Sequence, residues 1–386
     1  MPRSASFACA SIFAALLVAA SSAHGASWSV QESPTGEVEG ATSLARVACS
    51  STTACTAVGH ETKSGITTTL VERWDGTSWV VQPSPNPGGA TRSVLSGVAC
   101  PSSTSCIAVG ATDGSPLVMA WDGTAWGTHS VPSPRDGHSI TLEAVACTSA
   151  SACTAVGSYV RPAGNPTLAS LAMRWDGTAW TIQATTNPAA YGNELLDVTC
   201  RSTTHCVAVG RSKAIGNSGY TTLAQVWDGT SWSTQTTPTV AGAVNTVLED
   251  VSCTATNECT AVGWTAGSGT PIMTAHAIRW NGTAWTRQTT VYPAGSSSIQ
   301  LASVVCASAT SCIAVGRYTD SGGVTRALAE EWNGTTWSLQ TTPTPPMAAS
   351  HAMTGLACPS AATICIGVGT ENTTYGTTVT LQEIYS

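Results

Sequence analysis

The sequence predicts an all-β protein, namely a seven-bladed β-propeller with four short strands in each blade. Three observations carry this prediction. A pair of Cys recurs seven times, a Trp-rich hairpin motif recurs six times, and the two ends of the chain carry complementary parts of one repeat. Repetition at a fixed period of about 50 residues is typical of proteins in which each repeat buries its apolar face against its neighbours.

The Cys pairs are the first landmark of every repeat. Fourteen of the 15 Cys form pairs that are six or seven residues apart, and each pair precedes Ala-Val-Gly or Gly-Val-Gly. The pairs are Cys49 and Cys55, Cys100 and Cys106, Cys147 and Cys153, Cys200 and Cys206, Cys253 and Cys259, Cys306 and Cys312, and Cys358 and Cys365. An even number of Cys in an exported chain indicates disulfides, and pairing within each blade is the simplest arrangement. A zinc site would need further ligands such as His, so we expect no metal.

The second landmark, about fifteen residues after each of these glycines, is Trp-Asp/Asn-Gly-Thr-x-Trp. Asp-Gly and Asn-Gly favour a type I′ hairpin turn, which would place the first Trp opposite the Thr. Both indoles should then project from one side of the hairpin. Thirteen of the 14 Trp, including Trp28, occupy such positions. We expect them to pack between neighbouring blades, with a ligand platform as the alternative.

The predicted strands of the first repeat cover residues 44–49, 55–59, 68–74 and 77–82, which are rich in Val, Thr and Trp. The two chain ends indicate how the repeats are joined.

Residues 27–31 match the fourth strand of a repeat, and residues 381–385 match the third strand. The N-terminal strand should therefore complete the last blade and close a ring, because this exchange removes an open sheet edge. An open solenoid, the alternative, would gain nothing from it.

The N-terminal residues predict export. Arg3 precedes a short apolar stretch from Phe7 to Ala20, and small residues offer a cleavage site after Ala23. We expect a signal peptide at 1–23 and a single propeller at 24–386, secreted as a monomer. An uncleaved anchor is the alternative, but the apolar stretch is shorter than the ~20 residues that a spanning helix needs. The net charge of −7 and the lack of a basic stripe argue against nucleic acid.

These repeats resemble those of secreted bacterial β-propeller proteins over the whole predicted mature chain. The Asp-Gly-Thr-x-Trp element is similar to a shortened Asp-box of sialidase-type propellers and to the Trp-rich repeats of propeller lectins. Its spacing differs from the Asp-box by one residue, and no sialidase catalytic set accompanies it. The resemblance implies the fold and identifies no substrate.

Propeller topology places the turns between the second and third strands, and the links between blades, on one face. This face varies between repeats, and variable loops on a rigid scaffold often carry binding groups. The residue after each repeat glycine should lie near the mouth of the central channel. We expect a ligand site in the fourth to sixth blades, formed by Arg211, Tyr220, Trp264, Arg317 and Tyr318. Guanidinium and aromatic groups suit carbohydrate or an acidic peptide.

The sequence thus predicts an extracellular, non-enzymatic binding or scaffold protein with no cofactor, whose partner is an unidentified protein or carbohydrate. The alternative is a carbohydrate-active protein, either a lectin or a glycoside hydrolase. Acidic residues on the first strands, such as Glu143, Asp197, Glu249 and Asp250, would approach one another near the channel. A carboxylate pair at a suitable separation would support glycoside hydrolysis. Charged residues that simply line a polar channel are the competing explanation.

Overall fold

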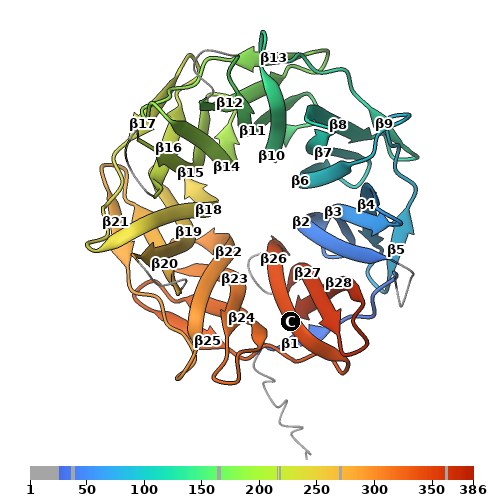
Figure 1. The fold of residues 1–386 in the computed structure, drawn as a ribbon, viewed down its shortest axis with the longest axis vertical. Coiled ribbons are helices and arrows are strands. Elements are labelled where there is room, and N and C mark those ends of the chain that lie inside the picture. The colour runs from blue at the N-terminus through green and yellow to red at the C-terminus, as the bar shows by residue number, and fades with distance from the viewer. Residues whose placement is uncertain are drawn as a thin grey trace, which may run out of the picture.

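The computed structural model describes residues 26–35, 40–162, 167–214, 216, 219–268, 272–360 and 364–386. The predicted signal peptide, residues 1–23, lies outside the described residues. Every regular element in the described part is a β-strand, so the chain is all-β. Figure 1 shows these strands grouped into sheets around a central axis.

The strands form runs of four antiparallel strands, and each run is here called a sheet. Single parallel pairs, Ala41 with Thr378 and Leu168 with Gly192, join neighbouring runs at two places. The first contains β2 (Ala41–Ser51), β3 (Ala54–Lys63), β4 (Ile66–Trp74) and β5 (Trp79–Gln82), each paired with the next. The first strand of each sheet lies nearest the axis, and the fourth lies at the outer rim (Figure 1). The first three strands are longer than the sequence predicted, because their pairing continues past the Cys and past the repeat glycine.

The same order recurs along the chain. The next two sheets contain β6 (Ser93–Ser102), β7 (Ser105–Thr112), β8 (Ser115–Trp121), β9 (Trp126–Thr128), β10 (His138–Ser149), β11 (Ala152–Val160), β12 (Leu168–Trp175) and β13 (Trp180–Gln183). They are followed by β14 (Gly192–Ser202), β15 (His205–Lys213), β16 (Thr221–Trp227), β17 (Trp232–Gln235), β18 (Ala243–Ala255), β19 (Glu258–Gly267), β20 (Met273–Trp280) and β21 (Trp285–Gln288). After them come β22 (Ser297–Ser308), β23 (Ser311–Thr319), β24 (Thr325–Trp332) and β25 (Trp337–Gln340).

The two ends of the chain share one sheet. It consists of β26 (Ala348–Ser360), β27 (Ile364–Thr373), β28 (Thr378–Tyr385) and the N-terminal β1 (Trp28–Val30). Trp28 pairs with Tyr385, and the backbone groups of Ser27 and Ser386 exchange hydrogen bonds of 3.0 and 3.1 Å. The N-terminal strand therefore supplies the fourth strand beside β28, as its likeness to the other fourth strands predicted.

A β-bulge in every first strand explains the repeat glycine. In β2, Leu44 pairs with Gly59 and Arg46 pairs with Val58, so Ala45 has no partner of its own. A Cβ atom on Gly59 would lie 1.9 Å from the carbonyl oxygen of Ser43, which no side chain could tolerate. The corresponding separations in the other sheets are 2.0–2.1 Å. Only glycine allows the bulged strand to approach so closely.

Seven disulfides confirm the predicted pairing of Cys within each sheet. They join Cys49 with Cys55, Cys100 with Cys106, Cys147 with Cys153, Cys200 with Cys206, Cys253 with Cys259, Cys306 with Cys312, and Cys358 with Cys365. Each bond lies within the hairpin of the first two strands, and Cys49 and Cys55 lie directly opposite each other in the β2–β3 ladder. Six of the bonds join residues six positions apart, and the last joins residues seven apart. Each bond therefore secures one hairpin and does not connect neighbouring sheets.

The Trp-rich hairpin differs from the predicted type I′ turn. Trp74 pairs directly with Trp79 instead of lying opposite Thr77, so the loop has four residues, and Gly76 has a φ of 100°. The Asp75 Oδ1 atom accepts hydrogen bonds from the Thr77 amide, the Thr77 hydroxyl and the Ser78 amide at 2.7–2.9 Å. The prediction of register was wrong because this side chain stabilises a wider loop. Both indoles still lie on one side of the hairpin.

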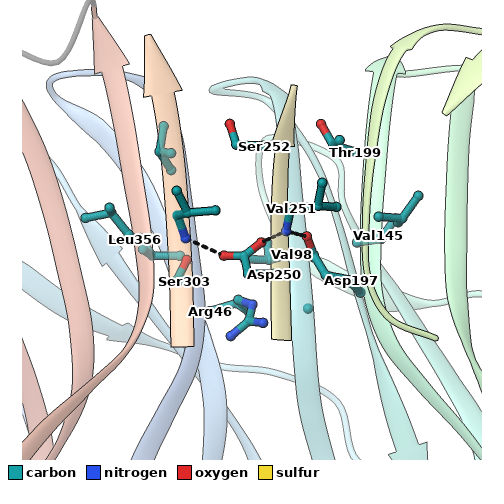
Figure 2. Close-up of a pocket in the computed structure, with 16 residues that line it drawn as sticks. Arg46, Val98, Val145, Asp197, Thr199, Asp250, Val251, Ser252, Ser303 and Leu356 are labelled. Carbon is teal, nitrogen blue, oxygen red and sulfur yellow. Dashed lines mark hydrogen bonds between the residues drawn. The ribbon is translucent and has the colours of Figure 1, made fainter. Parts of the chain in front are cut away.

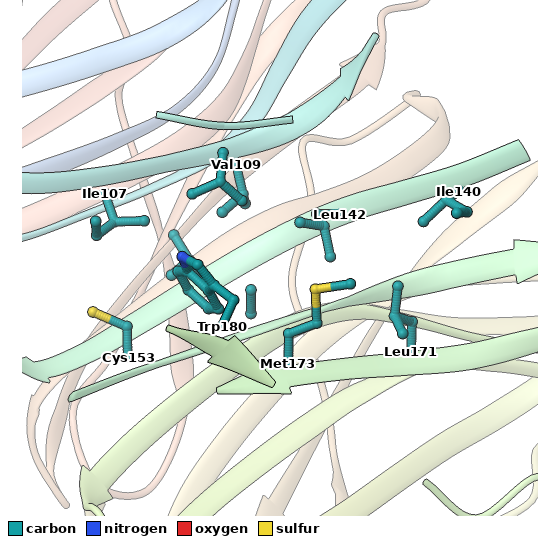
Figure 3. Packing of buried hydrophobic residues seen from close by; sticks show 11 residues of the cluster. Ile107, Val109, Ile140, Leu142, Cys153, Leu171, Met173 and Trp180 are labelled. Carbon is teal, nitrogen blue, oxygen red and sulfur yellow. The ribbon is translucent and has the colours of Figure 1, made fainter. Parts of the chain in front are cut away.

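The hairpin Trp residues belong to the apolar layers between sheets. The second Trp of each motif and Trp28 are no more than 6% exposed. Figure 3 shows Trp180 packed with Ile107, Val109 and Leu142, which come from the β6–β9 and β10–β13 sheets. Between other neighbours, the Trp126 indole N–H donates to the Gln82 side chain at 3.1 Å. These contacts give the Trp residues a structural role.

Candidate functional site

The sheets present two different sides. The hairpin side contains the turns between first and second strands and between third and fourth strands, and these turns contact each other: the Trp74 indole N–H donates to the Thr52 carbonyl at 3.2 Å. The link side contains the remaining turns and the links between sheets. Here Thr67 N–H donates to Thr91 O at 3.0 Å, and Thr246 N–H donates to Tyr220 O at 2.8 Å. Backbone hydrogen bonds therefore join neighbouring sheets on the link side.

The residues that follow the repeat glycines pair with the residues that precede the bulge on the innermost strands. The pairs are Ser43–His60, Val94–Ala111, Thr141–Ser158, Glu194–Arg211, Val247–Trp264, Gln300–Arg317 and Ala352–Thr370. They lie at one level near the link-side ends of the strands. Large charged and aromatic side chains occur in three consecutive pairs, on β14–β15, β18–β19 and β22–β23. This arc is the sector that the sequence predicted as a ligand site.

Arg211 is the centre of one half of the arc. Its guanidinium donates two hydrogen bonds to the Glu194 carboxylate at 2.7 and 3.0 Å. Its Cζ lies 4.5 Å from the centre of the Tyr220 ring. Burial alone would lower the pKa of Arg211, but the hydrogen bond and charge of Glu194 outweigh it and raise that pKa. Arg211 and Tyr220 therefore form a fixed, charged, aromatic surface.

A hydrogen-bond chain holds the other half of the arc. The Trp264 indole N–H donates to the Glu249 carboxylate at 2.7 Å, and the Gln300 amide donates to the same oxygen at 3.3 Å. The Gln300 carbonyl oxygen in turn accepts from Arg317 Nε at 3.1 Å. Trp264 and Arg317 are thus linked through Glu249 of β18 and Gln300 of β22, and Arg317 remains exposed.

Tyr318 does not join this arrangement. It follows Arg317 on β23, so its side chain lies on the opposite face of the strand. There it packs against the apolar cluster that contains Leu328 and Trp332. Four of the five predicted residues thus contribute to the arc, and Tyr318 supports the neighbouring core.

Near the axis, the innermost strands enclose a cavity of about 210 Å³, lined by Val residues and by Arg46, Asp197 and Asp250 (Figure 2). Arg46 extends from β2 across the axis. Its guanidinium donates to the Thr354 carbonyl on β26 at 2.6 Å and to the Glu249 carbonyl on β18 at 3.3 Å. Burial would lower the pKa of Arg46, but the carboxylates of Asp250 and Asp197 raise it. One cation thus bridges strands on opposite sides of the cavity.

The acidic residues of the cavity do come together, as the sequence suggested. Figure 2 shows Asp197 and Asp250 on either side of the Val251 amide, which donates to both carboxyl groups at 2.9 and 2.8 Å. Asp250 also accepts from the Val304 amide of the next sheet at 2.9 Å. Burial, and then the charge of Asp250, raise the pKa of Asp197 well above its ordinary value. Each carboxyl group therefore accepts a hydrogen bond from a backbone amide of the next sheet.

No group of three or more His, Cys, Asp or Glu suited to a metal ion occurs among the described residues. In the same part of the chain no helix is long and apolar enough to span a bilayer.

Three residues at or near the site escaped the sequence prediction. Arg46 stands where other repeats have Gly, Ala, Asp or Ser, and its reach across the axis depends on the arrangement of several sheets. Tyr191 and Lys213 lie beside Tyr220, and the Lys213 ammonium is 5.4 Å from the centre of each ring. Tyr191 belongs to a segment of the variable face, whereas nothing in the repeat pattern singled out Lys213.

No family model matches the chain, and no curated protein matches it. Among solved structures, the chain is similar to one described as YCF48 bound to D1 peptide, with a TM-score of 0.55 and 12% identity over 93% of this chain and 96% of that one. It is also similar to a protein of unknown function from Dyadobacter fermentans DSM 18053, with a TM-score of 0.49 and 10% identity over 93% and 98% of the two chains. The first likeness, together with the repeated four-stranded sheets, supports a β-propeller fold.

Proposed function

We propose that this chain is an exported, closed, seven-bladed propeller that binds a macromolecular partner on its link side. The pairing of β1 with β28 and the contacts of β26 with both β2 and β22 support the ring. The disulfides fit an oxidising compartment, which agrees with removal of residues 1–23 and a mature propeller spanning residues 24–386.

The observation that carries the binding function is the asymmetry of the arc. Arg211, Trp264 and Arg317 occupy three consecutive copies of a position that holds smaller groups in most other sheets. Their side chains are held by Glu194, Glu249 and Gln300, which lowers the entropy lost when a ligand binds. Residues that are the same in every sheet usually serve packing between sheets, whereas Arg211, Trp264 and Arg317 differ from the residues at the equivalent positions of the other sheets. Tyr, Trp and Arg are also the side chains that most often dominate interfaces.

The partner is a protein segment in this proposal, and a carbohydrate is the second candidate. The solved neighbour described as YCF48 binds a D1 peptide, so a propeller of this general shape can hold a peptide. The partly exposed indole of Trp264 beside Glu249 and Gln300 favours the carbohydrate alternative, because aromatic faces and polar side chains together suit sugars. Catalysis is not part of the proposal, since Asp197 and Asp250 engage backbone amides of neighbouring sheets.

The test compares the wild-type protein with a double variant that carries Trp264→Ala and Arg317→Ala. Both are immobilised and exposed to secreted and surface material of the producing organism, and both are probed on a glycan array. We expect the wild type to retain a protein ligand and the double variant to lose at least ~10-fold in affinity. Binding to a defined glycan and to no protein would replace the first candidate with the lectin. Equal binding by both proteins would overturn the location of the site.

A further inference from the structure

A second recess lies beside the arc, at the outer edge of β16. Its volume is about 480 Å³, and its walls come from β16, from the end of β17 and from the link that leads to β18. Tyr220 lines this recess and also stacks on Arg211, so the recess and the arc share one wall. The lining is rich in Thr hydroxyls and includes Leu223, Pro238 and Val240.

The equivalent places in two other sheets are filled by an Asn side chain. In the β2–β5 sheet, Asn86 Oδ1 accepts a hydrogen bond from the Thr69 amide at 3.0 Å. In the β10–β13 sheet, Asn187 Oδ1 accepts from the Ser170 amide at 2.9 Å. Both amides lie on the third strand, two residues before the residue that pairs with the final Gln of the short fourth strand. The Asn side chain therefore supplies the hydrogen-bond acceptor that a longer fourth strand would have provided.

The β14–β17 sheet has no such side chain. Its third strand carries Thr222 at this position, because Ala224 forms the last pair with Gln235 of β17. The link carries Thr239 where the other two sheets have Asn, four residues after the Gln that ends the fourth strand. Among the described residues, no link side chain bonds to the backbone N–H or C=O of Thr222, and Thr237 bonds only its hydroxyl, at 2.6 Å. An edge position of β16 thus remains open to the recess.

A cation lies beside Tyr220, which lines the recess. The Lys213 ammonium lies 5.4 Å from the centres of both the Tyr191 and the Tyr220 rings. In the part of the chain that the structure describes, no carboxylate lies within ion-pair distance of it, unlike Arg211 with Glu194. Tyr191 is 54% exposed, so the site can be reached from solvent. A positive charge held between aromatic rings attracts an anionic group of a ligand.

We propose that this recess binds an extended peptide segment that carries an acidic side chain. The peptide adds to the edge of β16 beyond the end of β17, exchanging main-chain hydrogen bonds with Thr222, and its carboxylate reaches Lys213. An open strand edge recognises a peptide backbone, whereas a saccharide has no matching row of donors and acceptors. The inference rests on the proposed binding function and specifies the chemistry of the partner.

The chain itself supplies the matched variants for a test. Thr239→Asn introduces the side chain that fills the equivalent place in two other sheets, and it should close the edge of β16 without harming the fold. Thr344→Asn makes the same change in the link after β25, away from the recess. Lys213→Met removes the charge and keeps most of the apolar stem. All three proteins are purified with their disulfides intact and compared with the wild type by thermal unfolding before binding is measured.

The probe is a random library of nine-residue peptides selected on the wild-type protein. We expect the selected peptides to be enriched in Asp or Glu, and to bind Thr239→Asn and Lys213→Met at least ~10-fold more weakly than the wild type and Thr344→Asn. N-methylation of the peptide backbone should cause a similar loss. Failure to select any peptide, or equal binding by Thr239→Asn and the wild type, overturns the inference. The proposed function survives that result if the double variant of Trp264 and Arg317 still loses the natural ligand, and it fails separately if that variant does not.

Discussion

Trp28 of β1 lies directly opposite Tyr385 of β28, and their ring centres are 5.3 Å apart. The Trp pairs of the other sheets have the same tilted arrangement at 5.7–5.9 Å. The Trp28–Tyr385 contact therefore reproduces the Trp–Trp contact of the other sheets. In those sheets a hairpin loop joins the two strands, whereas here the strands come from opposite ends of the chain. The Trp28–Tyr385 contact depends on a strand of only three residues.

Trp28→Ala should consequently weaken the whole protein. Trp28 is 6% exposed, and removal of a buried Trp costs about 3–5 kcal/mol. The measurement is equilibrium unfolding in urea, followed by Trp fluorescence and by circular dichroism. Ser29→Ala, on the exposed face of the same strand, is the control and should change the free energy of unfolding by less than about 0.5 kcal/mol. A Trp28→Ala protein as stable as this control would show that β1 contributes nothing to the ring.

The repeat glycines should be intolerant of a methyl group. In Gly263→Ala the new Cβ would meet the Val247 carbonyl oxygen at 2.1 Å, so the bulge of β18 would have to move. We expect a loss on the order of 3 kcal/mol in the free energy of unfolding, as for an overpacked core. Gly127→Ala provides the comparison, because no atom lies within 4 Å of the added Cβ. Similar stability of the two variants would contradict the role assigned to the bulge.

The free energy of unfolding should decrease as pH rises through neutrality. Glu72, Glu330 and Glu383 have no exposed surface, and burial raises their pKa values from 4.5 to about 7, 8 and 8. The folded state therefore holds these protons to a higher pH than the unfolded chain does, and their contribution is lost between pH 4.5 and about 8. Burial lowers the pKa values of His276 and His351 from 6.5 to about 4, which opposes the trend below pH 6.5. The net fall should be steepest between about pH 6.5 and 8.

Glu383→Gln tests whether ionisation of this one buried carboxyl group contributes to the fall in stability with pH. Among the described residues, neither carboxyl oxygen of Glu383 has a hydrogen-bond partner, so the uncharged amide should fit the site without the cost of ionisation. We expect melting temperatures measured from pH 5 to 9 to fall less steeply for the variant, with a gain on the order of 1 kcal/mol at pH 8. Parallel curves for variant and wild type would contradict burial of this proton.

Replacing Arg46 near the axis should lower the free energy of unfolding, and replacing Asp197 as well should lessen that loss. Arg46→Met removes the buried charge that acts electrostatically on Asp197 and Asp250. It also removes hydrogen bonds to the Thr354 and Glu249 carbonyls, so we expect a loss of about 3 kcal/mol in the free energy of unfolding. Adding Asp197→Asn should recover part of that loss. Urea unfolding of the single and double variants gives the coupling energy between the two positions. Strictly additive effects would show that Arg46 and Asp197 do not interact.

Much of the fold could be predicted because three residue types report local geometry. Cys residues mark opposed positions in a hairpin, Trp residues mark the outer strands, and the repeat glycine marks the bulge. The register of the Trp hairpin could not be predicted from Asp-Gly alone. The Asp75 side chain, through three hydrogen bonds, selects a four-residue loop in place of the tighter turn.

The candidate site was predictable only where it follows the repeat. Arg211, Trp264 and Arg317 occupy the position after the repeat glycine, so counting from the glycine placed them on one level. Tyr318 was assigned to the same sector because it is adjacent in sequence, although neighbouring residues on a strand face opposite ways. The position of Arg46 relative to Glu249 depends on sheets about 200 residues apart in the chain, which no local pattern encodes.

The hydrogen bonds between Ser27 and Ser386 have a practical consequence for how the molecule is oriented. Both residues lie at the ends of strands that reach the disulfide-bearing side, whereas Arg211, Trp264 and Arg317 lie toward the opposite side. A tag joined after Ser386 would thus lie on the side of the protein opposite to the arc.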